Sequence, residues 1–198
     1  MDLAISISSS LKSLSEQRAN APGFVTMACH NEKELFNKIM LVNPPSLTQL
    51  KQMPNRKDRL LKAALEIPIF GTLVYHMIVS RDNINNLFIE KMYYNPFHVD
   101  NQMADAYYEA AHKGGYYTRF LYSSLAAKYI NINICHALKA LDNSIYIVEG
   151  ETEPNGKAVT DDYCASNPAI EVSVLKETKH LPHVEAPEAF LEQVKIFF

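Results

Sequence analysis

At the beginning of the chain, apolar residues recur with the spacing of one face of a helix. Apolar residues recur at spacings of four, four and three positions: Leu3, Ile7, Leu11 and Leu14. This spacing predicts an amphipathic helix over residues 2–16, with Asp2 as its N-terminal cap. A turn at residues 18–23 leads into a second predicted helix over residues 24–30, and Pro22 is tolerated in the first turn of such a helix.

A strand pattern comes next and is followed by a long helical region. Residues 38–43, Lys-Ile-Met-Leu-Val-Asn, form a short apolar run that Pro44 stops, which is typical of a buried strand in a parallel sheet. From there to residue 140, helical patterns are separated by Pro, Gly and Asn, and no strand pattern is found. The predicted helices of this region are 57–66, 69–80, 82–93, 101–113, 115–129 and 131–142.

The C-terminal part returns to alternating strands and helices. Strand patterns lie at residues 144–148 and 170–175, with a predicted helix over 157–166 between them and a last helix over 188–198. Strands that alternate with helices predict an α/β fold with a parallel sheet.

This order of elements divides the chain into two parts. We predict a partial parallel sheet of three or four strands with helices on both faces, formed by residues 1–45 and 141–198. The helical region of residues 46–140 is too long to be a loop, so we expect it to pack as an all-helical subdomain.

Composition and charge exclude some classes of partner. The 198 residues are 47% hydrophobic and 21% charged, with a formal net charge of −3. Because no basic stretch could neutralise a run of phosphates, we expect no nucleic-acid partner. The three cysteines are Cys29, Cys135 and Cys164, which are far apart in the sequence. This usage favours reduced thiols in a cytoplasmic protein.

Neither a targeting segment nor a membrane span is expected. The first residues lack the positive charge and the long apolar run of a signal peptide. The longest apolar stretch is residues 67–79, which contains Pro68 and Gly71 and is too short and too polar to span a bilayer. We expect this stretch to be buried or to line an apolar pocket rather than to lie on a membrane surface.

The candidate chemistry lies in the last fifty residues. After the strand at 144–148 comes Gly-Glu-Thr-Glu-Pro, residues 150–154. After the last strand comes a loop in which four positions match the pattern H-x-P-x-x-E-x-P: His180, Pro182, Glu185 and Pro187. This order of strand, G-x-x-(acid), strand and histidine loop resembles the C-terminal end of the α/β-hydrolase superfamily.

The resemblance extends over most of the chain. Residues 37–45, Asn-Lys-Ile-Met-Leu-Val-Asn-Pro-Pro, resemble the strand that follows the nucleophile helix in this superfamily, and the helical region lies where such proteins carry a cap. The resemblance implies a cap-bearing hydrolase of the serine type. The chain has no room for the strands that precede the nucleophile helix in the family, so we expect an N-terminally truncated form.

The nucleophile position departs from the family pattern. The G-x-S-x-G elbow of the family corresponds to residues 19–23, Ala-Asn-Ala-Pro-Gly, so Ala21 takes the place of the serine. Pro22 takes the place of the residue whose backbone N–H helps to form the oxyanion hole, and proline has no N–H. The position therefore lacks both the attacking hydroxyl and one donor.

The resemblance implies that His180 is the catalytic base and that Glu153 is the acid that orients it, with Glu151 as the second choice. Other readings of nearby residues stay open. His180 and His183 could suggest a metal site, but no third ligand is evident. Cys29 could replace the nucleophile, although its place in a helix favours packing against the sheet. No cofactor and no metal are expected.

Four hypotheses for function follow. The first is a hydrolase of carboxylic esters or similar acyl substrates with impaired catalysis, and the second is a non-catalytic relative that binds a small apolar ligand or a protein. The third is a fragment whose open sheet edge favours self-association. The fourth is an engineered Ala21 that traps a ligand. Whether the chain is an enzyme is not decided by its sequence.

Overall fold

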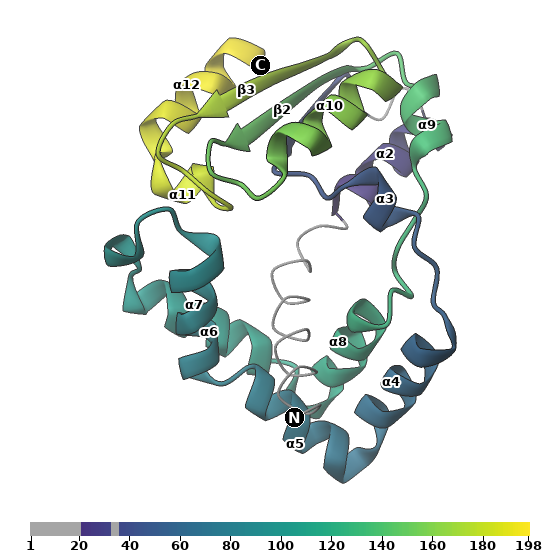
Figure 1. Ribbon diagram of the computed structural model, residues 1–198, viewed down its shortest axis with the longest axis vertical. Coiled ribbons are helices and arrows are strands. Elements are labelled where there is room, and N and C mark those ends of the chain that lie inside the picture. Colours follow the sequence, from purple (N-terminus) through teal and green to yellow (C-terminus); the bar gives the residue numbers. More distant parts are fainter. Residues whose placement is uncertain (1–20, 33–35) are drawn as a thin grey trace. The chain divides into compact units, whose positions relative to one another are not determined.

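The computed structural model describes residues 21–32 and 36–198 of the chain and divides into two compact units (Figure 1). The helical unit contains Gln52–Lys91 and Pro96–Asn131. The sheet unit contains the described part of Ala19–Lys51, together with Met92–Asn95 and Ile132–Phe198. The helix predicted over residues 2–16 lies outside the described residues.

A three-stranded parallel sheet forms the centre of the sheet unit, in the order β1-β2-β3 (Figure 1). The strands are β1 (Lys38–Val42), β2 (Ser144–Gly150) and β3 (Ile170–Leu175). All three strands were predicted from the sequence, and the α/β fold class is confirmed. Because the strands are parallel and in register, their carboxyl ends meet at one edge of the sheet.

One face of the sheet packs against four helices. Successive residues of a strand point to opposite faces, and on this face Ile39, Leu41, Ile145 and Ile147 join one apolar cluster. The helices with residues in or beside that cluster are α2 (Ala21–Asn31), α3 (Leu47–Leu50), α9 (Cys135–Ala140) and α10 (Gly156–Ser166). Helix α9 is shorter than the helix predicted over residues 131–142, and the backbone N–H of its first residue, Cys135, donates to the side chain of Asn133 at 3.2 Å.

The opposite face of the sheet packs against the last helix. Tyr146, Val148 and Leu175 form a second cluster with residues of α12 (Pro187–Phe197). The hydroxyl of Tyr146 also donates to Gln193 at 2.7 Å. Helices therefore cover both faces of the sheet, as expected for a parallel sheet. The short helix α11 (Pro182–Glu185), which precedes α12, was not predicted.

The helical unit contains no strand among its described residues. Its elements are α4 (Arg56–Glu66), α5 (Pro68–Ile78), α6 (Arg81–Leu87), the 3₁₀ turn η3 (Pro96–His98), α7 (Asn101–His112), the 3₁₀ turn η4 (Gly115–Tyr117) and α8 (Thr118–Ala126). The predicted helix over 82–93 is α6 continued by one π-helical segment, η2 (Phe88–Met92). A buried cluster joins α4, α5 and α8 through Leu65, Tyr75, Ile78, Val79 and Tyr122.

Helices α4 and α5 meet at a tight corner. Helix α4 begins at a reciprocal cap in which Asn55 and Asp58 bond to each other's backbone N–H groups. It ends at Ile67, and α5 starts at once with Pro68, which suits a first helical position. A Cβ at Gly71 would overlap the backbone carbonyl of Leu65, so the corner requires glycine at this position.

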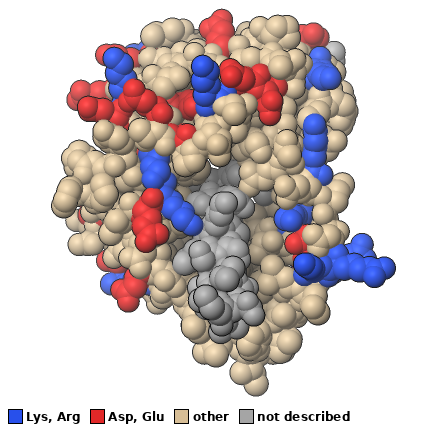
Figure 2. All heavy atoms as spheres, viewed as in Figure 1, with Lys and Arg blue, Asp and Glu red and all other residues tan. Residues whose placement is uncertain are grey.

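We expected residues 67–79 to be buried or to line an apolar pocket, and burial is found on only one face of α5. That face contributes Tyr75, Ile78 and Val79 to the core. Five apolar side chains, however, are at least half exposed: Ile67, Ile69, Phe70, Leu73 and Met77. The stretch is apolar nearly all round, and only one side of a helix can face α4 and α8. Figure 2 shows uncharged surface over the end of the helical unit that α5 forms.

Within residues 21–32 and 36–198, no single helix has the length and hydropathy needed to cross a membrane. Helices α4 and α5 meet that criterion only as a pair, with a bend of 98° between them.

The close approach at Gly71 predicts a position-specific cost of adding a methyl group. Gly71→Ala should lower the free energy of unfolding by about 1–3 kcal/mol, because the Leu65 backbone must move. Gly23→Ala is the matched control within a helix, since its nearest side-chain atoms would lie at 3.8 and 3.9 Å. It should be neutral or stabilise by about 0.5–1 kcal/mol through helix propensity. Urea denaturation measures both, and equal effects would contradict the corner geometry.

Candidate active site

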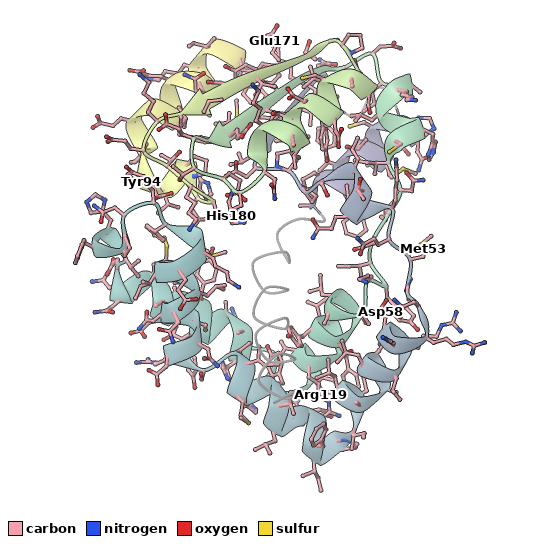
Figure 3. The ribbon with its side chains drawn as sticks, viewed as in Figure 1. Met53, Asp58, Tyr94, Arg119, Glu171 and His180 are labelled. Atoms are coloured by element: carbon pink, nitrogen blue, oxygen red, sulfur yellow. The ribbon has the colours of Figure 1, made fainter. Side chains whose placement is uncertain are left out.

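His180 and Glu153 contact each other at the carboxyl edge of the sheet. The Nδ1 atom of His180 lies 3.1 Å from Oε1 and 3.2 Å from Oε2 of Glu153. The side chains are 19% and 21% exposed, so the pair is shielded but reachable. Glu153 follows β2 and His180 follows β3, and Figure 3 labels His180 at the end of the strands. Adjacent parallel strands therefore bring His180 and Glu153 to one place, where ligand sites of α/β sheets are commonly found.

The contact assigns different roles to the two ring nitrogens of His180. When Nδ1–H donates to the Glu153 carboxylate, the neutral ring carries its lone pair on Nε2. That atom can then accept a proton from a substrate or from water, and the carboxylate stabilises the imidazolium that forms. The sequence resemblance implies these roles for the two residues, and the contact of Nδ1 with the carboxylate has the geometry they require.

The turn after β2 brings Glu153, rather than Glu151, to the histidine. The backbone N–H of Glu153 donates to the Gly150 carbonyl at 3.0 Å and closes the turn. Two further backbone bonds tie this turn to β3 and the loop after it: Glu151 N–H to Leu175 and Thr152 N–H to Thr178, both at 3.0 Å. The Glu151 carboxylate accepts the backbone N–H of Glu177 at 3.0 Å. Glu151 thus braces the neighbouring turn, and Glu153 contacts the ring.

Asn43 connects the ends of β1 and β2 to the histidine loop that follows β3. It follows β1 with a left-handed backbone, φ +42°, which asparagine tolerates better than most residues. Its backbone N–H donates to the Val148 carbonyl at 3.0 Å. Its side-chain amide donates to the carbonyls of Lys179 at 2.8 Å and His180 at 3.0 Å, and its side-chain oxygen accepts the N–H of Gly150 at 3.0 Å.

The histidine loop passes close to the end of β2. A Cβ at Gly150 would overlap the carbonyl of Lys179, so glycine is needed where the two backbones cross. This gives the glycine of the G-x-x-(acid) pattern a steric reason. Because Gly150 has no side chain, its N–H can also bond to Asn43 while the histidine loop packs against it.

A second brace holds the loop from the side of Met92–Asn95. The carboxylate of Glu185 accepts the backbone N–H groups of Tyr94 at 2.5 Å and Lys179 at 2.7 Å. The backbone N–H of His180 donates to the Met92 carbonyl at 3.1 Å. Figure 3 labels Tyr94 in this segment and His180 in the loop. Glu185 is part of the sequence motif, but no role was predicted for it. In the structure its carboxylate holds the histidine loop in place.

A buried carboxyl lies next to this pair. Glu149, at the end of β2, is 6% exposed and lies against Gly156, the first residue of α10. Burial raises the pKa of Glu149 above its usual value, while a hydrogen bond from Thr160 opposes the shift. The neighbouring carboxyl of Glu153 raises the same pKa further. When Glu149 is protonated, it adds no negative charge beside the carboxylate of Glu153.

The position that the resemblance assigns to the nucleophile carries no hydroxyl. Ala21 is the first residue of α2 and is exposed, and Pro22 is buried behind it. The hydroxyl of Thr26 donates to the Pro22 carbonyl at 2.7 Å and so is engaged within the helix. The first two residues of the elbow, at 19 and 20, lie outside the described residues.

Two other readings of the sequence find no support in the geometry. Cys29 is fully buried in the cluster between α2 and the sheet, and burial raises the pKa of its thiol, which disfavours a nucleophilic thiolate. The ring of His183 lies 5.8 Å from that of Phe190, centre to centre. The described part of the chain contains no group of three or more His, Cys, Asp or Glu residues that could hold a metal ion.

The contacts of Asn43 predict a large loss of stability when its side chain is removed. Asn43→Gly tolerates the left-handed backbone, so its effect isolates three side-chain hydrogen bonds, which contribute about 0.5–1.5 kcal/mol each. Asn43→Ala should destabilise further, by about 1 kcal/mol, because alanine is strained at positive φ. Chemical denaturation measures both.

Hydrogen exchange shows which part of the structure is loosened when the Asn43 side chain is removed. Amide protons of the loop around Lys179 and His180 should exchange faster in Asn43→Gly, while those in the middle of β2 stay protected. Uniform loosening of the whole sheet would contradict a local role for Asn43.

No protein-family model matches the chain, and no curated protein matches it in sequence. Solved structures do match. A meta-cleavage product hydrolase from Pseudomonas fluorescens is 18% identical, with a TM-score of 0.65 over 91% of this chain and 62% of its own. A bromoperoxidase from Bacillus anthracis is 12% identical, with a TM-score of 0.62 over 90% and 64%. A carboxylesterase structure from Nitrososphaera gargenis is 16% identical, with a TM-score of 0.55 over 87% and 59%.

These similarities concern the fold. The chain spans less than two thirds of the length of each of these three proteins. The parallel sheet, the helices on both of its faces and the order of its elements agree with the predicted architecture. The chain therefore has the fold of an α/β-hydrolase.

Proposed function

We propose that this chain is a hydrolase of carboxylic esters or similar acyl compounds in which His180 acts as the base and Glu153 orients it. The observation that carries the proposal is the contact of Nδ1 of His180 with both carboxylate oxygens of Glu153, at 3.1 and 3.2 Å. Support comes from the braces on both sides of the loop, because a base must be held in a fixed geometry to act in a transition state.

The reaction supported by the residues in place uses water. Nε2 of His180 takes a proton from a water molecule, and the resulting hydroxide adds to the ester carbonyl. The tetrahedral intermediate collapses, the C–O bond to the alcohol breaks, and the imidazolium returns its proton to the leaving alkoxide. The products are a carboxylic acid and an alcohol. General-base help of this kind contributes about 10²–10⁴-fold.

The absence of a hydroxyl at Ala21 limits this activity. A serine at that position would open a covalent route with an acyl-enzyme intermediate. Pro22 lacks the N–H that would stabilise an oxyanion, and removal of one such donor costs about 10²–10³-fold in other enzymes. We therefore expect slow turnover by the chain as it stands.

A second candidate function follows from the same two residues. Ala21 and Pro22 favour a non-catalytic protein that keeps the fold and binds a small apolar or ester-like molecule. On this proposal His180 and Glu153 provide a polar anchor for a carbonyl group and do not turn the ligand over.

The helical unit and the free thiols suggest further features. We infer that the helical unit acts as the cap of the hydrolase fold, because its helices are inserted between β1 and β2. Cys29, Cys135 and Cys164 are free thiols, which favours a reducing compartment such as the cytoplasm.

Turnover of a short p-nitrophenyl ester tests the proposal. Hydrolysis by the unaltered chain should fall by about 10²-fold or more in His180→Ala, because the base is lost. Glu153→Gln should also lower it, since an amide cannot stabilise the imidazolium. His183→Ala and Glu151→Gln are the matched controls, because they change the same residue types in the same loops.

The Ala21→Ser variant separates the two candidate functions. If the site is catalytic, the added hydroxyl should raise turnover, and the gain should disappear when His180→Ala is combined with it. If neither the unaltered chain nor Ala21→Ser hydrolyses the ester, but the ester binds, the hydrolase proposal is rejected and the binding protein is favoured.

A further inference from the structure

The corner between α4 and α5 presents an unusual set of exposed apolar side chains. Four of them, Ile67, Ile69, Phe70 and Leu73, are 50%, 86%, 50% and 61% exposed. They lie within seven consecutive positions at a bend of 98°, so they project at the end of two helices rather than along a flat face. We call these four side chains, together with the exposed ones of η4 and α8 described next, the apolar corner.

Arg119 connects this corner to apolar residues of η4 and α8. One guanidinium nitrogen donates to the carbonyl of Pro68 at 2.8 Å. The same guanidinium lies 4.6 Å from the ring centre of Phe120 and 5.8 Å from that of Tyr116. The exposed apolar or aromatic residues on this side are Tyr116, Tyr117, Phe120 and Leu121. The buried Arg119 therefore lies between the exposed apolar side chains of the α4–α5 corner and those of η4 and α8, and the two sets form one surface.

The backbone carbonyls of the corner have partners within the helical unit. Arg119 bonds to the carbonyls of Pro68 and, at 3.5 Å, Glu66. The Ile67 carbonyl accepts the N–H of Gly71 at 2.8 Å, and Pro68 has no N–H to satisfy. An apolar medium excludes backbone groups that lack hydrogen bonds. These carbonyls can leave water without losing a bond, whereas the first turn of α5 has no side-chain cap for its N–H groups.

Basic side chains gather where α4 begins. Arg56, Lys57 and Arg59 are exposed. The two acidic residues of α4 are neutralised: Asp58 caps the helix and contacts Lys128 at 3.4 Å, and Glu66 pairs with Lys62. Figure 2 shows blue side chains on the side of the helical unit where α4 starts and uncharged surface at its α5 end. The helix is therefore positive on its exposed side.

We propose that the apolar corner is a peripheral membrane-binding surface that inserts Ile69 and Phe70 among the lipids of an anionic bilayer, with the basic residues of α4 facing the headgroups. An apolar tip combined with exposed basic residues fits an interfacial segment. A dimer of two copies would bury a flat, self-complementary patch, and a projecting bend provides no such face. This surface belongs to the helical unit and is independent of His180 and Glu153.

Vesicle flotation with the full chain tests this proposal. The chain should float with vesicles of phosphatidylcholine mixed with phosphatidylserine, and less with phosphatidylcholine alone. The double variant Ile69→Ser with Phe70→Ser should bind about tenfold or more weakly, because two apolar side chains no longer insert. Arg56→Gln combined with Lys57→Gln and Arg59→Gln should remove the preference for phosphatidylserine, as should high salt.

Phe97→Ser is the matched control, because Phe97 is 94% exposed in the same unit but lies on η3. It should bind vesicles like the unaltered chain. Thermal melting should show that all variants are folded, since every changed side chain is on the surface.

Three outcomes would overturn the proposal. The first is no flotation with either vesicle, and the second is an equal loss in Phe97→Ser and in the double variant. The third is a dimer in sedimentation that the double variant turns into a monomer without any vesicle binding, which would make the corner an interface between copies of the chain.

Discussion

The hydrogen bonds of Asn43 are the constraint on which the candidate site depends. The loops that carry His180 and Glu153 start at the carboxyl ends of the parallel strands. Asn43 bonds to the backbone of the histidine loop and of Gly150 at once. With Glu185 on the other side of the loop, it converts three separate chain segments into one frame. The contact between His180 and Glu153 lies within that frame.

The same frame explains which residues of the motif are necessary. Gly150 allows two backbones to cross, Glu185 accepts two N–H groups, and Pro182 starts the short helix that turns the chain towards α12. None of these three residues needs to touch a substrate. The departures that the resemblance implies at Ala21 and Pro22 are different, because alanine has no hydroxyl and proline has no N–H. A site with a supported base and no attacking hydroxyl is consistent with slow water-mediated hydrolysis or with binding alone.

Much of the fold could be predicted from the sequence, because its strands and most of its helices have strong periodic patterns. The runs at Lys38–Val42 and Ile170–Leu175 were located within a residue or two. Short helices such as α3 and α11 were missed, since four residues are too few to show a period. The exposure of Ile69 and Phe70 was also missed, because hydropathy alone does not tell which face of an apolar helix has a partner. The role of Asn43 depends on segments more than one hundred residues apart in sequence, which no local pattern reveals.

The most direct measurement of the central claim is the protonation state of the two ring nitrogens of His180, read by ¹⁵N NMR on histidine-labelled protein. His180→Asn identifies its signals. The account predicts that the neutral ring carries its proton on Nδ1, held by Glu153, and has a bare Nε2, and that Glu153→Gln shifts the Nδ1 signal. A neutral ring protonated on Nε2, or signals unaffected by Glu153→Gln, would contradict the claim that this pair forms an oriented base.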